Sequence, residues 1–274
     1  MSGKTAQGMT RRSFMKGAAS GAGAAAATGI GWAAAGTGAV PASRSGAYSF
    51  ETPPPPIPAG EIKGKVTAEI VVIGAGTSGL VCANAAAENG ANVVVIASSP
   101  APVGRGGSIH AYDSRLMRSL GLAPGSAAGI RDGLKTHSYR VDQEKWWLWV
   151  RKSGEAMDWL IDKMEAAGYR TVIELGNTDP EGVMTMRPGS HSWLGKGIKT
   201  AGRSQQIVAD TLAETALARG VRIDFNTIAA RLVRESENTG RVRAVVAKTP
   251  DAGYRVYEGT KAVVLATGVF RDEE

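Results

Sequence analysis

The hydrophobic pattern of the chain becomes regular after residue 64, and each change of its period predicts an element. Four apolar residues in a row, 70–73, are typical of a buried parallel strand, because such a strand has apolar neighbours on both faces. Small and apolar residues recur at helical spacing over residues 77–89, and Gly90 ends the predicted helix. A second apolar run, residues 92–96, predicts a second strand. The three elements form a βαβ unit of about 30 residues.

The next regular segments are helical. Residues 142–152 predict one helix, and Ser153 is expected to cap a second helix that Gly168 ends. The first of these helices contains three tryptophans, which are expected to pack in the core rather than to form a ligand platform. They are Trp146, Trp147 and Trp149.

A run of short strands closes the chain. The glycine-rich residues 175–201 have no clear period, and no element is expected there. An amphipathic helix is predicted over residues 204–219. Strands are predicted over residues 221–225, 228–233, 242–247, 254–257 and 262–266.

The turn inside the βαβ unit is Gly74-x-Gly76-x-x-Gly79. Gly74 allows a tight turn, Gly76 lets the backbone approach a pyrophosphate, and Gly79 lets the helix pack closely on the strand. The helix N-terminus then faces the phosphates. Because the motif lies between a predicted strand and a predicted helix, it indicates a dinucleotide site. The acidic residue expected after the second strand is missing, since Ala97 stands there and Ser98 and Ser99 follow.

Charge and cysteine content exclude two classes of function. The net charge of the chain is +7, but the first 42 residues contain four basic residues and no acidic ones, which leaves 28 basic and 25 acidic residues. This balance does not indicate binding of nucleic acid. Cys82 is the only cysteine, so the chain has no internal disulfide and no cysteine-based metal site, and no metal ligand is assigned. At its helical position Cys82 is expected to act as a small buried hydrophobe.

The N-terminus resembles a signal of the twin-arginine (Tat) export route. Arg11 and Arg12 precede a charge-free stretch, residues 17–40, whose seven glycines argue against a transmembrane anchor. Cleavage is expected after Ala42 or Ala47. The protein is therefore expected to use the Tat machinery and to reach the periplasm or the outer face of the cell envelope. The predicted parts are a signal peptide over residues 1–42, a proline-rich linker over residues 43–64 and a folded domain over residues 65–274.

Four landmarks stand in a fixed order along residues 68–270, and together they resemble one enzyme family. They are the glycine triplet with Thr77 and Ser78, the tetrapeptide Arg105-Gly106-Gly107-Ser108, the octapeptide SGEAMDWL at residues 153–160, and the closing run of residues 240–268 that ends in Ala266-Thr267-Gly268. The family is that of the fumarate reductase and succinate dehydrogenase flavoproteins, in particular its soluble flavocytochrome c-like branch. The resemblance implies an α/β fold: a doubly wound, Rossmann-like FAD-binding domain with an inserted β-meander, whose capping domain is absent from this chain.

The resemblance also implies which residues bind FAD. The pyrophosphate is expected at Gly74, Gly76, Thr77, Ser78 and Gly79, and the ribityl and flavin end at Arg105, Gly106, Gly107 and Ser108. The backbone of Ala229 is expected at the adenine, and Ala266, Thr267 and Gly268 are expected to approach the cofactor from the last strand.

Two departures from the family concern how FAD is held. Ala97 occupies the position of the glutamate that holds the adenosine ribose in the family, so Ser98 or Ser99 is expected to take over part of this role. The membrane-bound branch attaches FAD to a histidine near Arg105, where this chain has Gly106 and Gly107. Non-covalent FAD is therefore implied, and His110 keeps covalent attachment open as an alternative.

The implied activity is that of an exported FAD-dependent oxidoreductase. Reduced flavin passes hydride to the activated C=C bond of a fumarate-like or other enoate or enone acceptor. A cytochrome or a quinol-linked protein is the expected electron donor, because the chain has no Cys-x-x-Cys-His haem motif. In the family, the histidine and arginine residues that bind the acceptor follow the last strand, and the sequence ends at Glu274 before them. No catalytic residue is assigned, and His137 and His191 are read as surface or loop histidines.

Two other interpretations stay open. In the first, the chain is a truncated, non-catalytic paralogue that binds FAD weakly. In the second, the glycine triplet belongs to an NAD(P)-binding dehydrogenase. The second is disfavoured because Ala97 supplies no acid for the ribose and the Ala266-Thr267-Gly268 strand end has no role in it.

Overall fold

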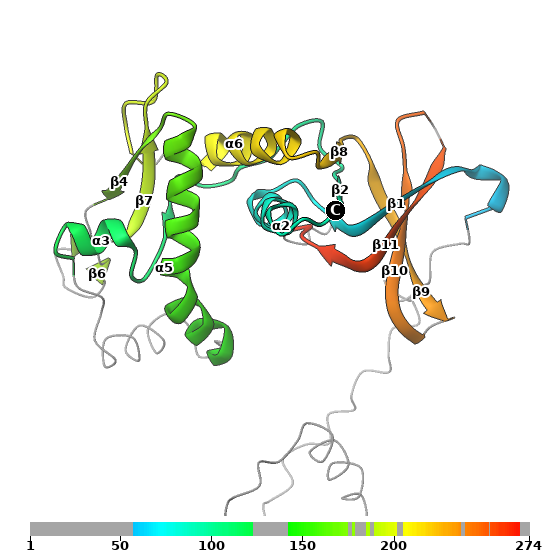
Figure 1. Cartoon of the computed structure of the whole chain (residues 1–274), viewed down its shortest axis with the longest axis horizontal. Helices are drawn as coiled ribbons and strands as arrows, with labels where there is room; N and C mark the ends of the chain where they lie inside the picture. The colour runs from blue at the N-terminus through cyan, green and yellow to red at the C-terminus, as the bar shows by residue number, and fades with distance from the viewer. Residues whose placement is uncertain are drawn as a thin grey trace, which may run out of the picture. The chain divides into compact units, whose positions relative to one another are not determined.

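A six-stranded sheet organises the folded part of the chain (Figure 1). The computed structural model describes residues 57–122, 142–174, 177–178, 185–186, 189–201, 205–236, 239–251 and 253–268. The chain divides into two units, Met1–Pro55 and Pro56–Glu274, and all of the described residues belong to the second unit. The predicted signal peptide and His137 lie outside the described residues.

The sheet has the strand order β8-β2-β1-β11-β10-β9. Four of these strands are parallel: β8 (Arg222–Asp224), β2 (Val93–Ile96), β1 (Ile62–Ile73) and β11 (Tyr254–Leu265). The antiparallel strands β9 (Ile228–Ser236) and β10 (Thr239–Lys248) lead into β11. The predicted α/β fold, with parallel strands and a β-meander inserted before the last strand, is confirmed.

Both faces of the sheet are covered, which is why its central strands read as continuous apolar runs. Val93 and Val95 of β2 pack in a core cluster with Leu80 and Leu212, and Val94 packs in a second cluster on the other face. The first cluster lies under the helices α2 (Thr77–Glu88), α5 (Gln143–Ala166) and α6 (Gln205–Ala218). The second contains Val245 of β10 and Tyr257 of β11, so strands of the meander share the core on that face.

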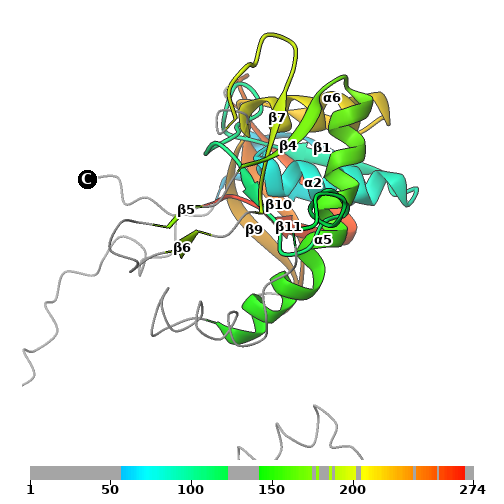
Figure 2. The same cartoon turned by 90° about the vertical axis from the view of Figure 1, so that its left-hand side faces the viewer.

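A smaller region follows the βαβ unit and packs on α5. It contains the short helix α3 (Arg115–Ser119) and a three-stranded sheet of β3 (Ile109–His110), β7 (Ser190–Leu194) and β4 (Arg170–Glu174). Figure 2 shows α5 beside α6 and beside the strands β4 and β7. The remaining elements are a 3-10 helix, η2 (Ala59–Glu61), and the pair β5 (Asn177–Thr178) and β6 (Thr185–Met186).

Several predicted element boundaries are wrong. The two helices predicted over residues 142–168 are one helix of 24 residues, and its N-cap is Asp142, whose side chain accepts a hydrogen bond from the amide of Lys145. Ser153 lies inside this helix, where its hydroxyl accepts a hydrogen bond from the amide of Tyr112 at 2.9 Å. No strand was expected where β7 forms.

The strands β1 and β11 are longer than their apolar runs. β1 begins at Ile62, inside the segment predicted as a linker, and β11 joins two predicted strands into one of 12 residues. The first halves of the two strands pair with each other, and a register shift near Gly259 lets the pairing continue to Ile73 and Leu265. None of the described helices has both the length and the apolar character needed to span a membrane.

Candidate functional site

The parallel strands end at one edge of the sheet, and their connections meet there. Gly74 follows β1 and donates its amide to the carbonyl oxygen of Ile96 at 2.8 Å, while Ala266 follows β11 and donates to Ile73 at 2.8 Å. In the strand order of the sheet, β2 is the neighbour of β1 on one side and β11 is its neighbour on the other side. Ligands of open α/β sheets bind at such a switch point, outside the carboxyl ends of the strands.

The packing around the loop leaves no room for a side chain at two of its three glycines. A Cβ atom at Gly74, where φ is +118°, would lie 2.3 Å from the carbonyl oxygen of Ala266, and one at Gly79 would lie 2.0 Å from the carbonyl oxygen of Gly74. Gly76 differs: its φ of −83° and ψ of 176° suit any residue, and the nearest atom to a Cβ would be 3.8 Å away. A ligand that approaches the backbone at Gly76 explains its lack of a side chain.

The N-terminus of α2 fits an anion beside this loop. Gly76 is the N-cap residue and offers no side chain to the first amides of the helix, and the first turn has no acidic residue. The positive end of the helix dipole is therefore left for a negatively charged group. Thr77 and Ser78 lie in this first turn, where they were predicted to meet the pyrophosphate.

The loop after β2 is fixed beside the glycine loop. Val103 donates its amide to the carbonyl oxygen of Ala75 at 3.1 Å. The side chain of Gln206, in the first turn of α6, accepts from the amide of Gly104 at 3.0 Å and donates to the carbonyl oxygen of Pro102 at 3.0 Å. The predicted residues Arg105, Gly106, Gly107 and Ser108 leave directly from this fixed point. Thr267 and Gly268 are exposed just beyond β11.

The other end of the predicted site lies beyond β2 and β8. Ala97 is 5% exposed and belongs to the core, whereas Ser98 is exposed. The chain crosses here from β8 to β9, with the amide of Thr227 donating to Ala97 at 2.8 Å. Ala229 follows two residues later, exposed in β9 and opposite Ala247. The structure thus places Ser98 close to the segment that leads to Ala229.

A family model for the FAD binding domain matches residues 69–273. The chain belongs to this family. Its cofactor is FAD, and the fit of the glycine loop to a pyrophosphate is the structural counterpart of that match.

Two relatives are similar over most of the folded unit. The vinyl phenol reductase of Lactiplantibacillus plantarum is 25% identical over 204 residues, which are 73% of this chain and 37% of that protein. The "Probable fumarate reductase Ifc3" of Shewanella frigidimarina is 25% identical over 212 residues, 74% of this chain and 32% of that protein. The chain therefore spans about a third of the length of these curated relatives.

A solved structure has the same fold. The 3-ketosteroid-delta4-(5alpha)-dehydrogenase from Rhodococcus jostii RHA1 superposes with a TM-score of 0.63 at 24% identity, over 74% of this chain and 46% of that chain. Its identity is low, so it supports the fold and no more than the fold.

His191 is a buried residue of β7, so its interpretation as a surface or loop histidine is wrong. Its ring is 0% exposed, with Nδ1 at 2.8 Å from the carbonyl oxygen of Gly189 and Nε2 at 2.7 Å from Oγ of Ser114. A carbonyl oxygen can only accept, so Nδ1 carries the proton and Nε2 accepts from the Ser114 hydroxyl. The same hydroxyl oxygen accepts from the amide of Met117 and caps α3.

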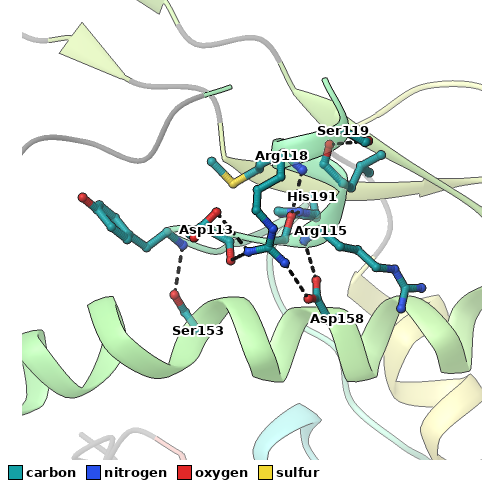
Figure 3. A network of polar contacts seen from close by, with 11 residues as sticks. Asp113, Arg115, Arg118, Ser119, Ser153, Asp158 and His191 are labelled. Atoms are coloured by element: carbon teal, nitrogen blue, oxygen red, sulfur yellow. Dashed lines mark hydrogen bonds and ion pairs between the residues drawn. The ribbon is translucent and has the colours of Figure 1, made fainter. Parts of the chain in front are cut away.

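Charged groups also bind the segment around Ser114 to the helix α5 (Figure 3). Asp158 of α5 accepts from the amide of Arg115 at 2.7 Å and pairs with the guanidinium of Arg118 at 3.4 Å. Gly154 packs against the chain at Asp113, since a Cβ there would lie 1.9 Å from the Asp113 carbonyl oxygen. These contacts hold the chain segment that follows Ser108. Asp158 is paired with groups of both Arg115 and Arg118, which is typical of a structural network.

The tryptophans of α5 do not pack in the core, contrary to the prediction. Trp146, Trp147 and Trp149 are partly exposed and belong to neither core cluster. The ring of Trp149 lies 5.4 Å from that of His110 and 6.1 Å from that of Tyr112. Trp146 and Trp149 therefore form an aromatic cluster with His110 and Tyr112, which follow Ser108 closely in the sequence.

We expect Gly76→Ala and Gly79→Ala to separate ligand binding from folding. Gly76→Ala should change the free energy of unfolding of the FAD-free protein by less than about 1 kcal/mol, since the new methyl meets only the carbonyl oxygen of Val103, at an ordinary contact distance of 3.8 Å. It should lower FAD affinity by about tenfold or more, as expected for weakened charge-assisted hydrogen bonds to the pyrophosphate. Gly79→Ala should cost about 1–3 kcal/mol of stability through overpacking. Urea unfolding and flavin fluorescence titration measure the two effects. Equal FAD affinity of Gly76→Ala and wild type would contradict the assignment.

We also expect His191 to make the fold sensitive to acid. Burial lowers the pKa of His191 and outweighs the hydrogen bond to Gly189, which raises it. Above about pH 6.5 the ring is neutral in both folded and unfolded chains, so its contribution is complete. As the pH falls below that value the unfolded chain takes up the proton first, and stability should drop by up to about 1.4 kcal/mol per pH unit. His191→Gln, which cannot ionise, should lose less stability between pH 7.5 and 5.5 in urea titrations. An equal loss in both proteins would refute this account.

Proposed function

We propose that the chain is the FAD-binding part of an exported oxidoreductase that passes hydride from reduced flavin to the activated C=C bond of a fumarate-like or other enoate or enone acceptor. The observation that carries this proposal is the glycine loop, whose Gly76 leaves room for a ligand at the switch point of a chain that matches the FAD binding domain family. The names of the two relatives support the acceptor class, because vinyl phenols and fumarate both contain a C=C bond.

The residues of this chain supply the cofactor side of that reaction. When bound, FAD supplies the hydride. The loop from Gly74 to Gly79 and the N-terminus of α2 hold the pyrophosphate, and Arg105, Gly106, Gly107 and Ser108 lie at the flavin end. The segment after Ser108 is positioned by Ser114, His191 and Asp158. We propose that FAD is held without a covalent bond, because glycines stand beside Arg105. We assign no acceptor-binding or proton-donating residue within the described part of the chain.

The export route and the electron donor belong to the same proposal. We propose that Arg11 and Arg12 direct the protein to the Tat machinery and that a cytochrome or a quinol-linked protein reduces the flavin outside the cytoplasm. The twin arginines ahead of a charge-free stretch support the route. We expect a double change of Arg11 and Arg12 to lysine to keep the precursor in the cytoplasm. Cell fractionation measures this, and unchanged export of the double variant would refute the route.

The activity is tested on the protein expressed from its full reading frame. We expect it to purify with FAD that is released on denaturation. Dithionite should bleach the flavin under anaerobic conditions, and one of three acceptors should restore its absorbance: fumarate, a cinnamate or a steroid enone. The saturated product of that acceptor should have no effect, which controls for oxygen and for non-specific oxidation. Folded protein without flavin, or reduced flavin that none of these acceptors reoxidises, would overturn the proposal.

A further inference from the structure

The adenosine end of the site lacks the carboxylate that its family uses, and the structure shows what stands there instead. Ala97 is buried in the core, so its methyl group offers nothing to a ribose. Ser99 is already engaged, because its hydroxyl donates to the carbonyl oxygen of Ala101 at 2.7 Å. Of the two serines, Ser98 is the exposed one, and its hydroxyl has no hydrogen-bond partner within the described part of the chain.

Asn226 lies next to these serines. Its amide donates to the carbonyl oxygen of Ser99 at 3.0 Å, and the following amide, that of Thr227, donates to Ala97 at 2.8 Å. These two bonds fix Asn226 at the carboxyl edge of the sheet, between the end of β8 and the start of β9. The residue is exposed, and its carboxamide has no partner among the described residues.

The backbone of Asn226 adopts a conformation that costs energy. Its φ is +53°, and among the described residues only one other non-glycine residue, Lys196 with φ of 49°, has a positive φ. The ammonium group of Lys196 lies over the ring of Tyr169, at 4.9 Å from its centre, so that side chain has a contact in the folded chain. Asn226 has no such contact. Backbone strain of this kind is often found at ligand sites.

We propose that Ser98 and Asn226 together bind the 2′- and 3′-hydroxyls of the adenosine ribose of FAD, in place of the carboxylate that Ala97 cannot supply. The ribose hydroxyls each donate one hydrogen bond, and a carboxylate accepts both. The carboxamide oxygen of Asn226 accepts one of them, and the hydroxyl of Ser98 accepts the other or donates to it. The pair is a neutral replacement for a charged residue. The inference depends on FAD being the cofactor and is independent of which acceptor is reduced.

The test compares nucleotides with and without the ribose hydroxyls. Full-length protein freed of FAD is titrated calorimetrically with ADP and with 2′,3′-dideoxyadenosine 5′-diphosphate. Wild type should bind ADP more tightly than the dideoxy compound. Asn226→Gly should weaken ADP and FAD about five- to tenfold, as expected for one neutral hydrogen bond, and leave the dideoxy compound unaffected. Ser98→Ala should show the same selectivity without any change of backbone conformation.

Two controls separate this role from a purely structural one. Asn226→Gly relieves the positive φ, so the FAD-free variant should unfold at the same temperature as wild type or at a higher one. Lys196→Gly relieves the same strain away from the edge and should change the affinity for neither nucleotide. The proposal is overturned if Asn226→Gly and Ser98→Ala both bind ADP as wild type does, if they weaken both nucleotides equally, or if wild type does not distinguish the two nucleotides. Loss of enoate reduction with normal ADP binding would refute the proposed acceptor and leave this inference intact.

Discussion

The cofactor site depends on the parallel pairing of β1 with β11. These two strands are neighbours in the sheet, but they come from opposite ends of the sequence of the folded unit. The register runs from Ile62 with Tyr254 to Ile73 with Leu265. It brings the carbonyl oxygen of Ala266 against Gly74, where a side chain has no room. Because β2 pairs with the other side of β1, the connections diverge at this point. The pairing therefore creates the switch point, the tight turn and the approach to the N-terminus of α2 together.

The hydrophobic period of the sequence predicts the elements that bury apolar side chains. It misses the elements that bury polar side chains. β2 alternates between two apolar clusters, so its four residues read as one hydrophobic run. In β4 and β7 the buried residues include Thr171, His191 and Ser192, which show no apolar period. The polar atoms of His191 and Ser192 have partners that the local sequence does not reveal, Ser114 for His191 and Glu174 for Ser192. For the same reason His191 could not be recognised as buried.

The site was predictable to the extent that its geometry is local. The turn at Gly74 and the helix start at Gly76 depend on neighbouring residues, so a motif of six residues reports them. The loop after β2 is held by Gln206, which is 102 residues away from Gly104. Asn226 reaches the end of β2 only because β8 pairs beside it. Contacts of this kind leave no local pattern, which is why the sequence alone suggested Ser98 and not Asn226, the second residue of the ribose site that we propose.

The long-range pairing links cofactor affinity to folding. The pyrophosphate cradle is formed by two segments, Gly74 to Gly79 and Ala266 to Gly268. They meet only after two strands that are far apart in the sequence have paired, and such pairing is slow in folding. FAD binds the paired form, so it stabilises that form by about 2.7 kcal/mol when present at a hundred times its dissociation constant. The neutral ribose site that we propose in place of a carboxylate is expected to lower the affinity and with it this stabilisation. The pyrophosphate cradle must then supply most of it. That cradle includes Gly76, whose surroundings in the protein leave room for a side chain, so the ligand and not the packing of the loop accounts for the glycine.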